Sequence, residues 1–203
     1  MTKRTRTVFL VRHGESDWNR KGVVQGQRDD ALLTATGRRS ARELAERFSV
    51  GDVALVVSSD LRRARETAVP IGGRLGIIPV FDERLRERSL GELEGRPSEV
   101  LTPDVTGVKD GVVVDSEVAP RGGESLRQMY ERISSFVEDL RDHLGRGSLP
   151  GGSVILVGHG GSLRLVAAVL DEMPLEQMTW MSLENASVLE RTLPTRPSTV
   201  VSP

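Results

Sequence analysis

Short apolar runs that alternate with helical segments constrain the fold of this 203-residue chain more than any other feature. Residues 8–11, 53–57 and 154–157 are continuous apolar runs of strand length, which is typical of strands buried on both faces. Between these runs, apolar residues recur at the helical spacing of three and four positions. The pattern predicts strands at 8–11, 53–57, 77–80, 154–157 and 186–189, and helices at 36–48, 61–75, 126–144 and 163–170.

This alternation predicts an α/β fold, a three-layer sandwich in which helices flank a mostly parallel central sheet. We expect one domain over residues 1–203, with its core at about 8–190. Residues 97–123 contain four glycines and three prolines, which predicts a surface excursion with a short hairpin near residues 111–114. Pro79 indicates that the third strand lies at a sheet edge. The chain from Thr192 onwards contains three prolines, and we expect this tail to be disordered.

The composition excludes several classes of protein. The chain has no cysteine, which rules out disulfide scaffolds, thiolate metal sites, cysteine nucleophiles and iron–sulfur clusters. Its 28 basic and 29 acidic residues give a net charge of -1, so no overall field favours nucleic acid or a membrane surface. The apolar runs are too short for a membrane span or a signal-peptide core. We therefore expect a cytoplasmic protein that binds neither nucleic acid nor membrane.

Two of the three histidines come directly after predicted strands, each with glycine beside it. His13 follows the first strand, and His159, next to Gly160, follows the fourth. Ligands of parallel α/β sheets bind outside the carboxyl ends of the strands, and glycine there lets the backbone approach a ligand. Arg12 lies beside His13, and Arg63 lies in the first turn of the helix after the second strand. Two such arginines would form a bidentate, positively charged cradle for a phosphate.

A metal site is the chemical alternative, because the two histidines with Asp60 or Glu87 would make a two-histidine, one-carboxylate set. The neighbouring guanidinium groups argue against it. At about 4 Å and an effective dielectric constant near 20, each would repel a cation by several kcal/mol. We therefore expect a bound phosphoryl group, and neither a metal nor another cofactor.

Phosphoryl transfer without a metal needs a nucleophile, positive charge on the equatorial oxygens and a proton donor for the leaving oxygen. His13 can be the nucleophile if the attacking ring nitrogen is neutral. The two arginines and His159 can supply the positive charge. Glu87 follows the third predicted strand and is the candidate carboxyl donor.

The residues discussed above lie in a series of short motifs, which occur in this order along the chain: residues 10–16, Trp18-Asn19, Gln25-Gly26, Leu33-Thr34 with Gly37, 57–64, Thr67-Ala68, 85–87, Gly91, Glu94-Gly95, 122–125 and 157–161. In type and order, this series resembles the histidine phosphatase superfamily, which includes cofactor-dependent phosphoglycerate mutases and related phosphatases. An isolated Arg-His-Gly is a weak signal, but the ordered set is highly specific.

The resemblance implies a role for each matching residue. His13 would be phosphorylated, and Glu87 would be the general acid that later activates water. The phosphate pocket would contain Arg12, Arg63 and His159, with Asn19 adding a hydrogen bond. The substrate side and the phosphate loop would include Ser16, Gln25, Gly26 and Gly160.

Mutases of this family carry a longer excursion with paired basic residues, whereas residues 97–123 contain only Lys109 and Arg121. This difference favours a metal-independent phosphatase for a small phosphorylated metabolite, of the sugar phosphate or phosphoglycerate type. A cofactor-dependent mutase and a catalytically silent phospho-ligand binding protein are the alternatives. Homodimers are common in the family, and the sequence neither supports nor forbids one here.

Overall fold

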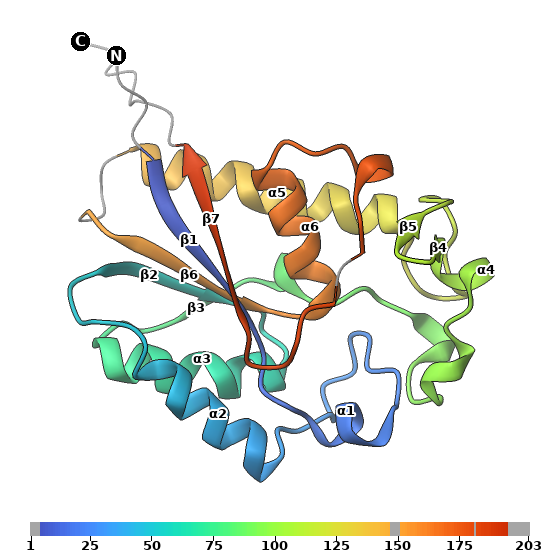
Figure 1. Ribbon diagram of the computed structural model, residues 1–203, viewed down its shortest axis with the longest axis horizontal. Coiled ribbons are helices and arrows are strands. Elements are labelled where there is room, and N and C mark those ends of the chain that lie inside the picture. Colours follow the sequence, from blue (N-terminus) through green and yellow to red (C-terminus); the bar gives the residue numbers. More distant parts are fainter. Residues whose placement is uncertain (1–4, 147–150, 181, 195–203) are drawn as a thin grey trace.

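The computed structural model describes residues 5–146, 151–180 and 182–194. Within these residues, one sheet has five strands in the order β3-β2-β6-β1-β7 (Figure 1). Neighbouring strands are parallel except for β7, which runs antiparallel to β1. The strands and α-helices are β1 Thr5–Arg12, α1 Asp17–Lys21, α2 Ala35–Ala45, β2 Val53–Ser58, α3 Arg62–Leu75, β3 Val80–Phe81, α4 Pro103–Thr106, β4 Val108–Lys109, β5 Val112–Val113, α5 Leu126–Gly145, β6 Ser153–Gly158, α6 Gly160–Leu170 and β7 Val188–Pro194.

Helices cover both faces of the sheet, which confirms the predicted three-layer α/β architecture (Figure 1). On one face, α5 and α6 pack against β1 and β6 through residues such as Leu10, Leu156 and Ile133. On the other face, α2 and α3 pack against residues that include Val56 and Ile155. Successive residues of β6 therefore point alternately into two separate cores, as expected for a strand buried on both faces.

Three local predictions differ from the structure. The third strand is only Val80–Phe81, although it does lie at the sheet edge. The last strand begins at Val188 and continues to Pro194, so the expected disorder from Thr192 is wrong for residues 192–194. Leu193 is fully buried and pairs with β1, and Pro194 is tolerated because β7 is an edge strand. The remaining tail, 195–203, lies outside the described residues.

The start of α3 has no side-chain cap. Leu61 is the N-cap residue, although Ser58, Ser59 and Asp60 just before it have oxygen atoms that could cap a helix. The Asp60 carboxylate instead accepts a hydrogen bond from Nε of Arg86 (2.8 Å). The ion pair with a guanidinium group outcompetes the weaker cap and ties the α3 loop to the segment that carries Glu87.

The excursion forms α4 and a small hairpin of β4 and β5, close to the predicted hairpin position. Arg88 is one of the buried side chains that connect it to the rest of the molecule. Its three guanidinium nitrogens donate to the carbonyl groups of Thr106, Val118 and Glu124 (2.6–2.8 Å). In Figure 1, the excursion lies beyond the carboxyl ends of the parallel strands. It is therefore positioned to cover whatever binds there.

Among the helices of the described residues, none combines the length and the apolar character that crossing a bilayer requires.

Candidate active site

The two histidines meet at the carboxyl ends of the adjacent strands β1 and β6. The backbone N–H of His13 donates to the carbonyl of Gly158, the last residue of β6 (3.0 Å). The rings of His13 and His159 lie edge to face, with centroids 5.1 Å apart. The strand-end rule therefore predicted this encounter correctly from residues that lie 146 positions apart in the sequence.

The ring of His13 is held by its own backbone neighbour. Nδ1 lies 2.7 Å from the carbonyl oxygen of Gly14. A carbonyl can only accept, so Nδ1 carries the proton and Nε2 keeps its lone pair. Burial, together with the positive charges of Arg63 and Arg12, lowers the pKa of His13 well below its usual range. His13 is therefore a neutral imidazole with a nucleophilic Nε2 at neutral pH.

His159 is equally buried and is oriented by a hydroxyl group. Its Nε2 lies 2.9 Å from Oγ of Ser59, in the loop after β2. Burial, the charge of Arg63 and the neighbouring ring of His13 lower the pKa of His159 well below its usual range. Its Nδ1 is buried and has no hydrogen-bond partner. An anion bound between the two rings would raise the pKa of His159 and favour its charged form, in which both ring nitrogens donate.

Two arginines complete the cationic side of the site. Both Nη groups of Arg63 donate to loop carbonyls, those of Gly26 and Arg28 (2.7 Å each). Each of these groups keeps a second N–H and Nε has no partner, so the cradle that Arg12 and Arg63 would form for a phosphate stays a prediction. Nη1 of Arg12 donates to the carbonyl of Leu183. Burial lowers the pKa of Arg63 to about 10, which still leaves it cationic at neutral pH.

Three nitrogen atoms of this site share a rare property. In the described part of the chain, the buried side-chain nitrogen and oxygen atoms that lack a hydrogen-bond partner are Nε of Arg12, Nε of Arg63 and Nδ1 of His159. Unsatisfied buried polar atoms are costly, by about 1–3 kcal/mol each, and need a reason. All three belong to the residues that flank His13. Together they form a set of donors suited to an anion.

The carboxyl group of Glu87 is fixed by two backbone amides. Oε2 accepts from the N–H of Gly161 (2.9 Å), in the first turn of α6, and Oε1 accepts from the N–H of Arg88 (2.9 Å). A Cβ at position 161 would lie 2.2 Å from Oε1 of Glu87, so any residue other than glycine would displace this carboxyl group. The negative charge of Glu87 acts on both Arg12 and Arg63, which places it at the same site.

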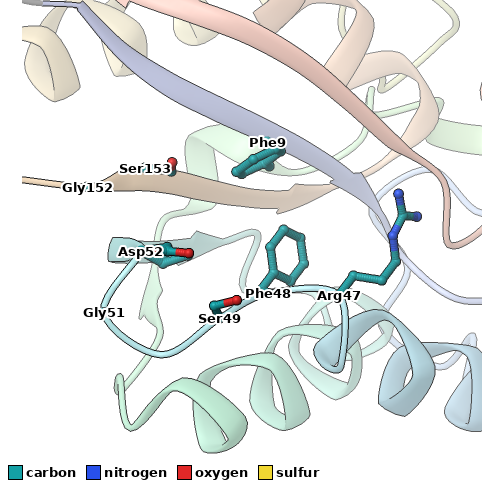
Figure 2. Close-up of a pocket in the computed structure, with 9 residues that line it drawn as sticks. Phe9, Arg47, Phe48, Ser49, Gly51, Asp52, Gly152 and Ser153 are labelled. Atoms are coloured by element: carbon teal, nitrogen blue, oxygen red, sulfur yellow. The ribbon is translucent and has the colours of Figure 1, made fainter.

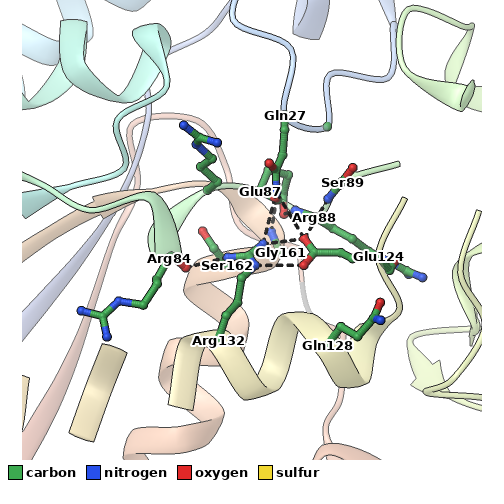
Figure 3. Close-up of polar contacts among 12 residues, drawn as sticks. Gln27, Arg84, Glu87, Arg88, Ser89, Glu124, Gln128, Arg132, Gly161 and Ser162 are labelled. Carbon is green, nitrogen blue, oxygen red and sulfur yellow. Dashed lines mark hydrogen bonds and ion pairs between the residues drawn. The ribbon is translucent and has the colours of Figure 1, made fainter. Parts of the chain in front are cut away.

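Glu124 and Arg132 hold the backbone of the segment that carries Glu87 (Figure 3). Arg132 donates to the Glu124 carboxylate (2.7 and 2.9 Å) and to the backbone carbonyls of Glu87 and Arg84 (2.9 and 2.6 Å). Glu124 also accepts from the N–H of Ser89 (2.8 Å). The predicted set did not include Arg132. The helical period identified its helix, but no local signal shows that its guanidinium group reaches another segment.

The side chains expected at the substrate side form a hydrogen-bond chain. Oδ1 of Asn19 accepts from the N–H and Oγ of Ser16 (3.0 Å each), and Ser16 Oγ lies 2.9 Å from Oε1 of Gln25. Asn185, which sequence reasoning missed, donates to both Asn19 (3.2 Å) and the carbonyl of His13 (3.1 Å). The segment before β7 is thereby joined to His13. Asn19 bonds to protein groups here, and its contact with phosphate stays a prediction.

A cavity of about 420 Å³ borders this site. Gln25, Gly26, Glu87 and Gly161 contribute to its wall, and so does the excursion. A second pocket, shown in Figure 2, lies at the opposite end of the sheet, around Phe48 and the first residues of β2 and β6. Ligands of parallel sheets bind at the carboxyl ends, so the cavity beside Glu87 is the candidate for the substrate.

Metal binding has no support in the geometry. Among residues 5–146, 151–180 and 182–194, no group of three or more histidine and carboxylate side chains is arranged to hold an ion. Asp60, a candidate ligand in the metal alternative, is paired with Arg86.

The fold and the site define a class: parallel α/β proteins with paired histidines and arginines at one edge of the sheet. The chain belongs to the histidine phosphatase superfamily, branch 1, whose family model matches residues 8–201. This agrees with the resemblance inferred from the sequence.

Named relatives differ in the activity that their names state. The chain is 35% identical over 189 residues to the probable phosphoglycerate mutase GpmB of Escherichia coli K12, covering 89% of this chain and 82% of the relative. The solved mycobacterial glucosyl-3-phosphoglycerate phosphatase is 34% identical with a TM-score of 0.79, covering 93% of this chain and 91% of that one. The solved protein TTHB049 of Thermus thermophilus is 33% identical with a TM-score of 0.66, covering 91% and 92%.

Proposed function

We propose that this protein is a metal-independent phosphatase that hydrolyses small phosphomonoesters through a phosphohistidine intermediate on His13. The observation that carries the proposal is the set of three unpartnered buried nitrogens, on Arg12, Arg63 and His159, around a neutral histidine. Donors that are already desolvated and fixed stabilise a developing negative charge without reorganisation. The phosphoryl group, with its distributed negative charge, fits such a set.

The geometry supports a two-step reaction. Nε2 of His13 attacks phosphorus while the bond to the leaving oxygen breaks, and Glu87 gives its proton to that oxygen. A water molecule then attacks the phosphohistidine and loses a proton to Glu87. The N–P bond breaks, and free phosphate and neutral His13 are regenerated. Arg12, Arg63 and His159 hold the equatorial oxygens in both steps.

The basic residues of the excursion support a phosphatase over a mutase, because they are only two and both are exposed to solvent. Arg121 lies in the excursion but is 87% exposed and pairs with Glu92, and Lys109 is exposed. A mutase must shield the phosphohistidine from water and hold the substrate during transfer. The names of several relatives nevertheless favour the mutase as the second candidate.

The experiment measures phosphate release from a panel of phosphate esters in the presence of a chelator. We expect turnover, and an acid-labile, base-stable phosphoenzyme that disappears in His13→Asn. Full activity of His13→Asn, or loss of activity with the chelator, would overturn the proposal. Conversion of 3- to 2-phosphoglycerate that depends on the bisphosphate would establish the mutase instead. Phosphate binding without turnover of any ester would indicate a silent binding protein.

A further inference from the structure

The cavity beside Glu87 is mainly apolar. Beyond the residues of the active site, its wall is formed by the side chains of Val23, Val24, Leu90, Leu101, Val108 and Trp180. Val108 and Leu101 come from the excursion, whereas Trp180 belongs to the segment after α6. The N–H of Trp180 donates to the carbonyl of Gly111 in the hairpin turn (2.6 Å), so the two sides of the wall are joined. The alcohol that leaves the phosphorus atom, on the side away from His13, would enter this apolar space.

Several polar groups in the same wall already bind protein groups. Arg88 uses its guanidinium nitrogens on three backbone carbonyls, and the hydroxyl of Thr106 donates to the carbonyl of Thr102 (2.9 Å). The side-chain amide oxygen of Gln25 lies within hydrogen-bond distance of Ser16 (2.9 Å). A sugar would bring several hydroxyl groups, each of which needs partners once it leaves water. The apolar side chains of the wall cannot supply these partners.

Arg164 is the cation that borders both the cavity and the phosphate site. Its guanidinium group lies over the ring of Trp180, 5.1 Å from the centroid. A Cβ on Gly160 would lie 3.2 Å from Nη1 of Arg164 and 3.7 Å from Nε of Arg12, so both guanidinium groups approach the same point. The charges of Glu87 and Arg12 both act on Arg164. A guanidinium group stacked on an aromatic ring can bind a carboxylate through its edge.

We propose that this cavity selects phosphomonoesters whose alcohol is apolar or aromatic and carries a carboxylate, which Arg164 binds, over esters of polyhydroxylated sugars. The inference rests on the proposed phosphatase activity and narrows its substrate class. It departs from the sugar phosphates that the family resemblance suggested. Arg164 is in this role a specificity-determining residue, distinct from the groups that transfer the phosphoryl group.

The first test compares esters matched in shape. Cyclohexylmethyl phosphate and glucose 6-phosphate share a six-membered ring and a primary alcohol, and differ mainly in hydroxyl groups. The para- and meta-carboxyphenyl phosphates and their carboxamide analogues differ in charge. We expect kcat/KM to favour the cyclohexyl ester over the sugar, and each carboxylate over its amide, by about tenfold or more, as expected for burying unpaired hydroxyls or losing a charge-assisted hydrogen bond.

The second test changes Arg164. In Arg164→Met, the preference for carboxylate over amide should fall to less than about threefold, while Arg164→Lys should keep part of it. The preference for cyclohexylmethyl over glucose ester should persist in both variants, because the apolar wall is unchanged. Arg121→Met, in the excursion but outside the cavity, is the matched control and should keep both preferences. Thermal unfolding of each variant reports whether it has folded.

Binding of para-carboxybenzylphosphonate, which cannot be hydrolysed, separates this inference from the proposed function. Calorimetry should give an affinity about tenfold weaker in Arg164→Met than in the unmodified protein, and no such loss for the carboxamide analogue. The assignment of Arg164 would be overturned if the unmodified protein and Arg164→Met bound the carboxylate phosphonate equally well, or if the carboxylate and carboxamide esters had equal kcat/KM. Equal kcat/KM for the cyclohexylmethyl and glucose esters would overturn the selection by the apolar wall. A chain that binds the phosphonates as expected but hydrolyses no ester would retain the assignment and lose the phosphatase.

Discussion

His13 and His159 are 2% and 1% exposed and lie among arginine side chains, an environment that opposes protonation of either ring. Desolvation is the larger cause, and the positive charges add to it. Neutral histidine is what a nucleophile needs. The positive charges that repel a proton from these rings would also attract a phosphoryl group.

These residues should make stability depend on pH. An unfolded chain protonates both histidines near their ordinary pKa of 6.5, whereas the folded chain does so only well below it. Between these values the unfolded state binds more protons, so the free energy of unfolding should fall as the pH falls. From about pH 7 to pH 5 we expect a loss of up to about 1.4 kcal/mol per pH unit for each histidine. Urea unfolding at several pH values measures it.

His143 supplies the control, because it is exposed near the end of α5. His143→Gln should keep the slope of the unmodified protein, whereas His13→Asn and His159→Asn should each reduce it. A slope that is unchanged in both buried-site variants would show that other groups determine the acid sensitivity.

Gly161→Ala tests the position of the general acid. The new Cβ would lie 2.2 Å from Oε1 of Glu87, so the carboxyl group must move. We expect kcat to fall about tenfold to a hundredfold for alkyl esters, whose leaving oxygen needs a proton, and much less for para-nitrophenyl phosphate. Gly73→Ala is the control, since a Cβ there meets nothing within 4 Å. An equal loss on both kinds of ester would argue against a protonation defect.

At the scale of elements, the short connections between helices and strands are fixed by arginines on neighbouring segments. Arg132 on α5 holds the backbone on both sides of the segment that contains Glu87, and its partner Glu124 holds Ser89. The side chains of this pair are 19% and 16% exposed. A helix thereby positions a residue on a loop that has no regular structure of its own.

Arg132→Met should therefore affect both stability and turnover. Removing Arg132 leaves the largely buried Glu124 carboxylate without its cationic partner and takes one donor from the carbonyls of Arg84 and Glu87, which we expect to cost about 2–4 kcal/mol. Arg127→Met is the matched change on the same helix. Its partners Glu117 and Glu176 are 71% and 56% exposed, so the cost should be below about 1 kcal/mol. Urea unfolding and kcat are measured for both variants. Equal losses of stability and of kcat in Arg132→Met and Arg127→Met would contradict the positioning role of Arg132.

The periodic segments were predictable because each buries one stripe or two faces of apolar residues. The helix α5, predicted at 126–144 and observed at Leu126–Gly145, is an example. β7 was not predicted beyond residue 189, because Pro194 lowers the strand signal, and the observed strand depends on pairing with β1. Boundaries of this kind depend on long-range hydrogen bonds, which leave no local pattern.

For the site, the proximity of His13 and His159 could be predicted from the sequence, because the carboxyl ends of parallel strands lie at the same edge of the sheet. The sequence was not sufficient for the orientation of Arg63, whose Nη groups bind two loop carbonyls. Backbone acceptors are present in every segment, so the residue types carry no information about which ones a side chain reaches. The contribution of Asn185 was missed for the same reason.

At the scale of the whole molecule, a net charge of -1 hides a strongly cationic interior edge. The charges that face the site are buried, and ordinary salt screens buried charges much less than exposed ones. Recognition of an anion should therefore be local to the cleft rather than the result of an overall field.

Inorganic phosphate should raise the thermal unfolding temperature through this site. At a hundred times its Kd, a ligand of the folded state adds about 2.7 kcal/mol, which is roughly 5–10 °C for a domain of this size. The shift should persist with a chelator and in moderate sodium chloride. It should be lost in Arg12→Met and kept in Arg38→Met, on the surface of α2. A shift that needs a divalent metal, or that survives Arg12→Met, would place phosphate elsewhere.

Arg88 has a consequence for how such a protein can change over evolution. Its side chain carries the attachments to Thr106 and Val118 in the excursion, and it is the next residue after Glu87. The three carbonyls that it binds are backbone groups, which any sequence provides. The sequence of the excursion can thus change, and with it the preferred alcohol, while Arg88 and the proposed proton donor Glu87 are inherited together as one dipeptide.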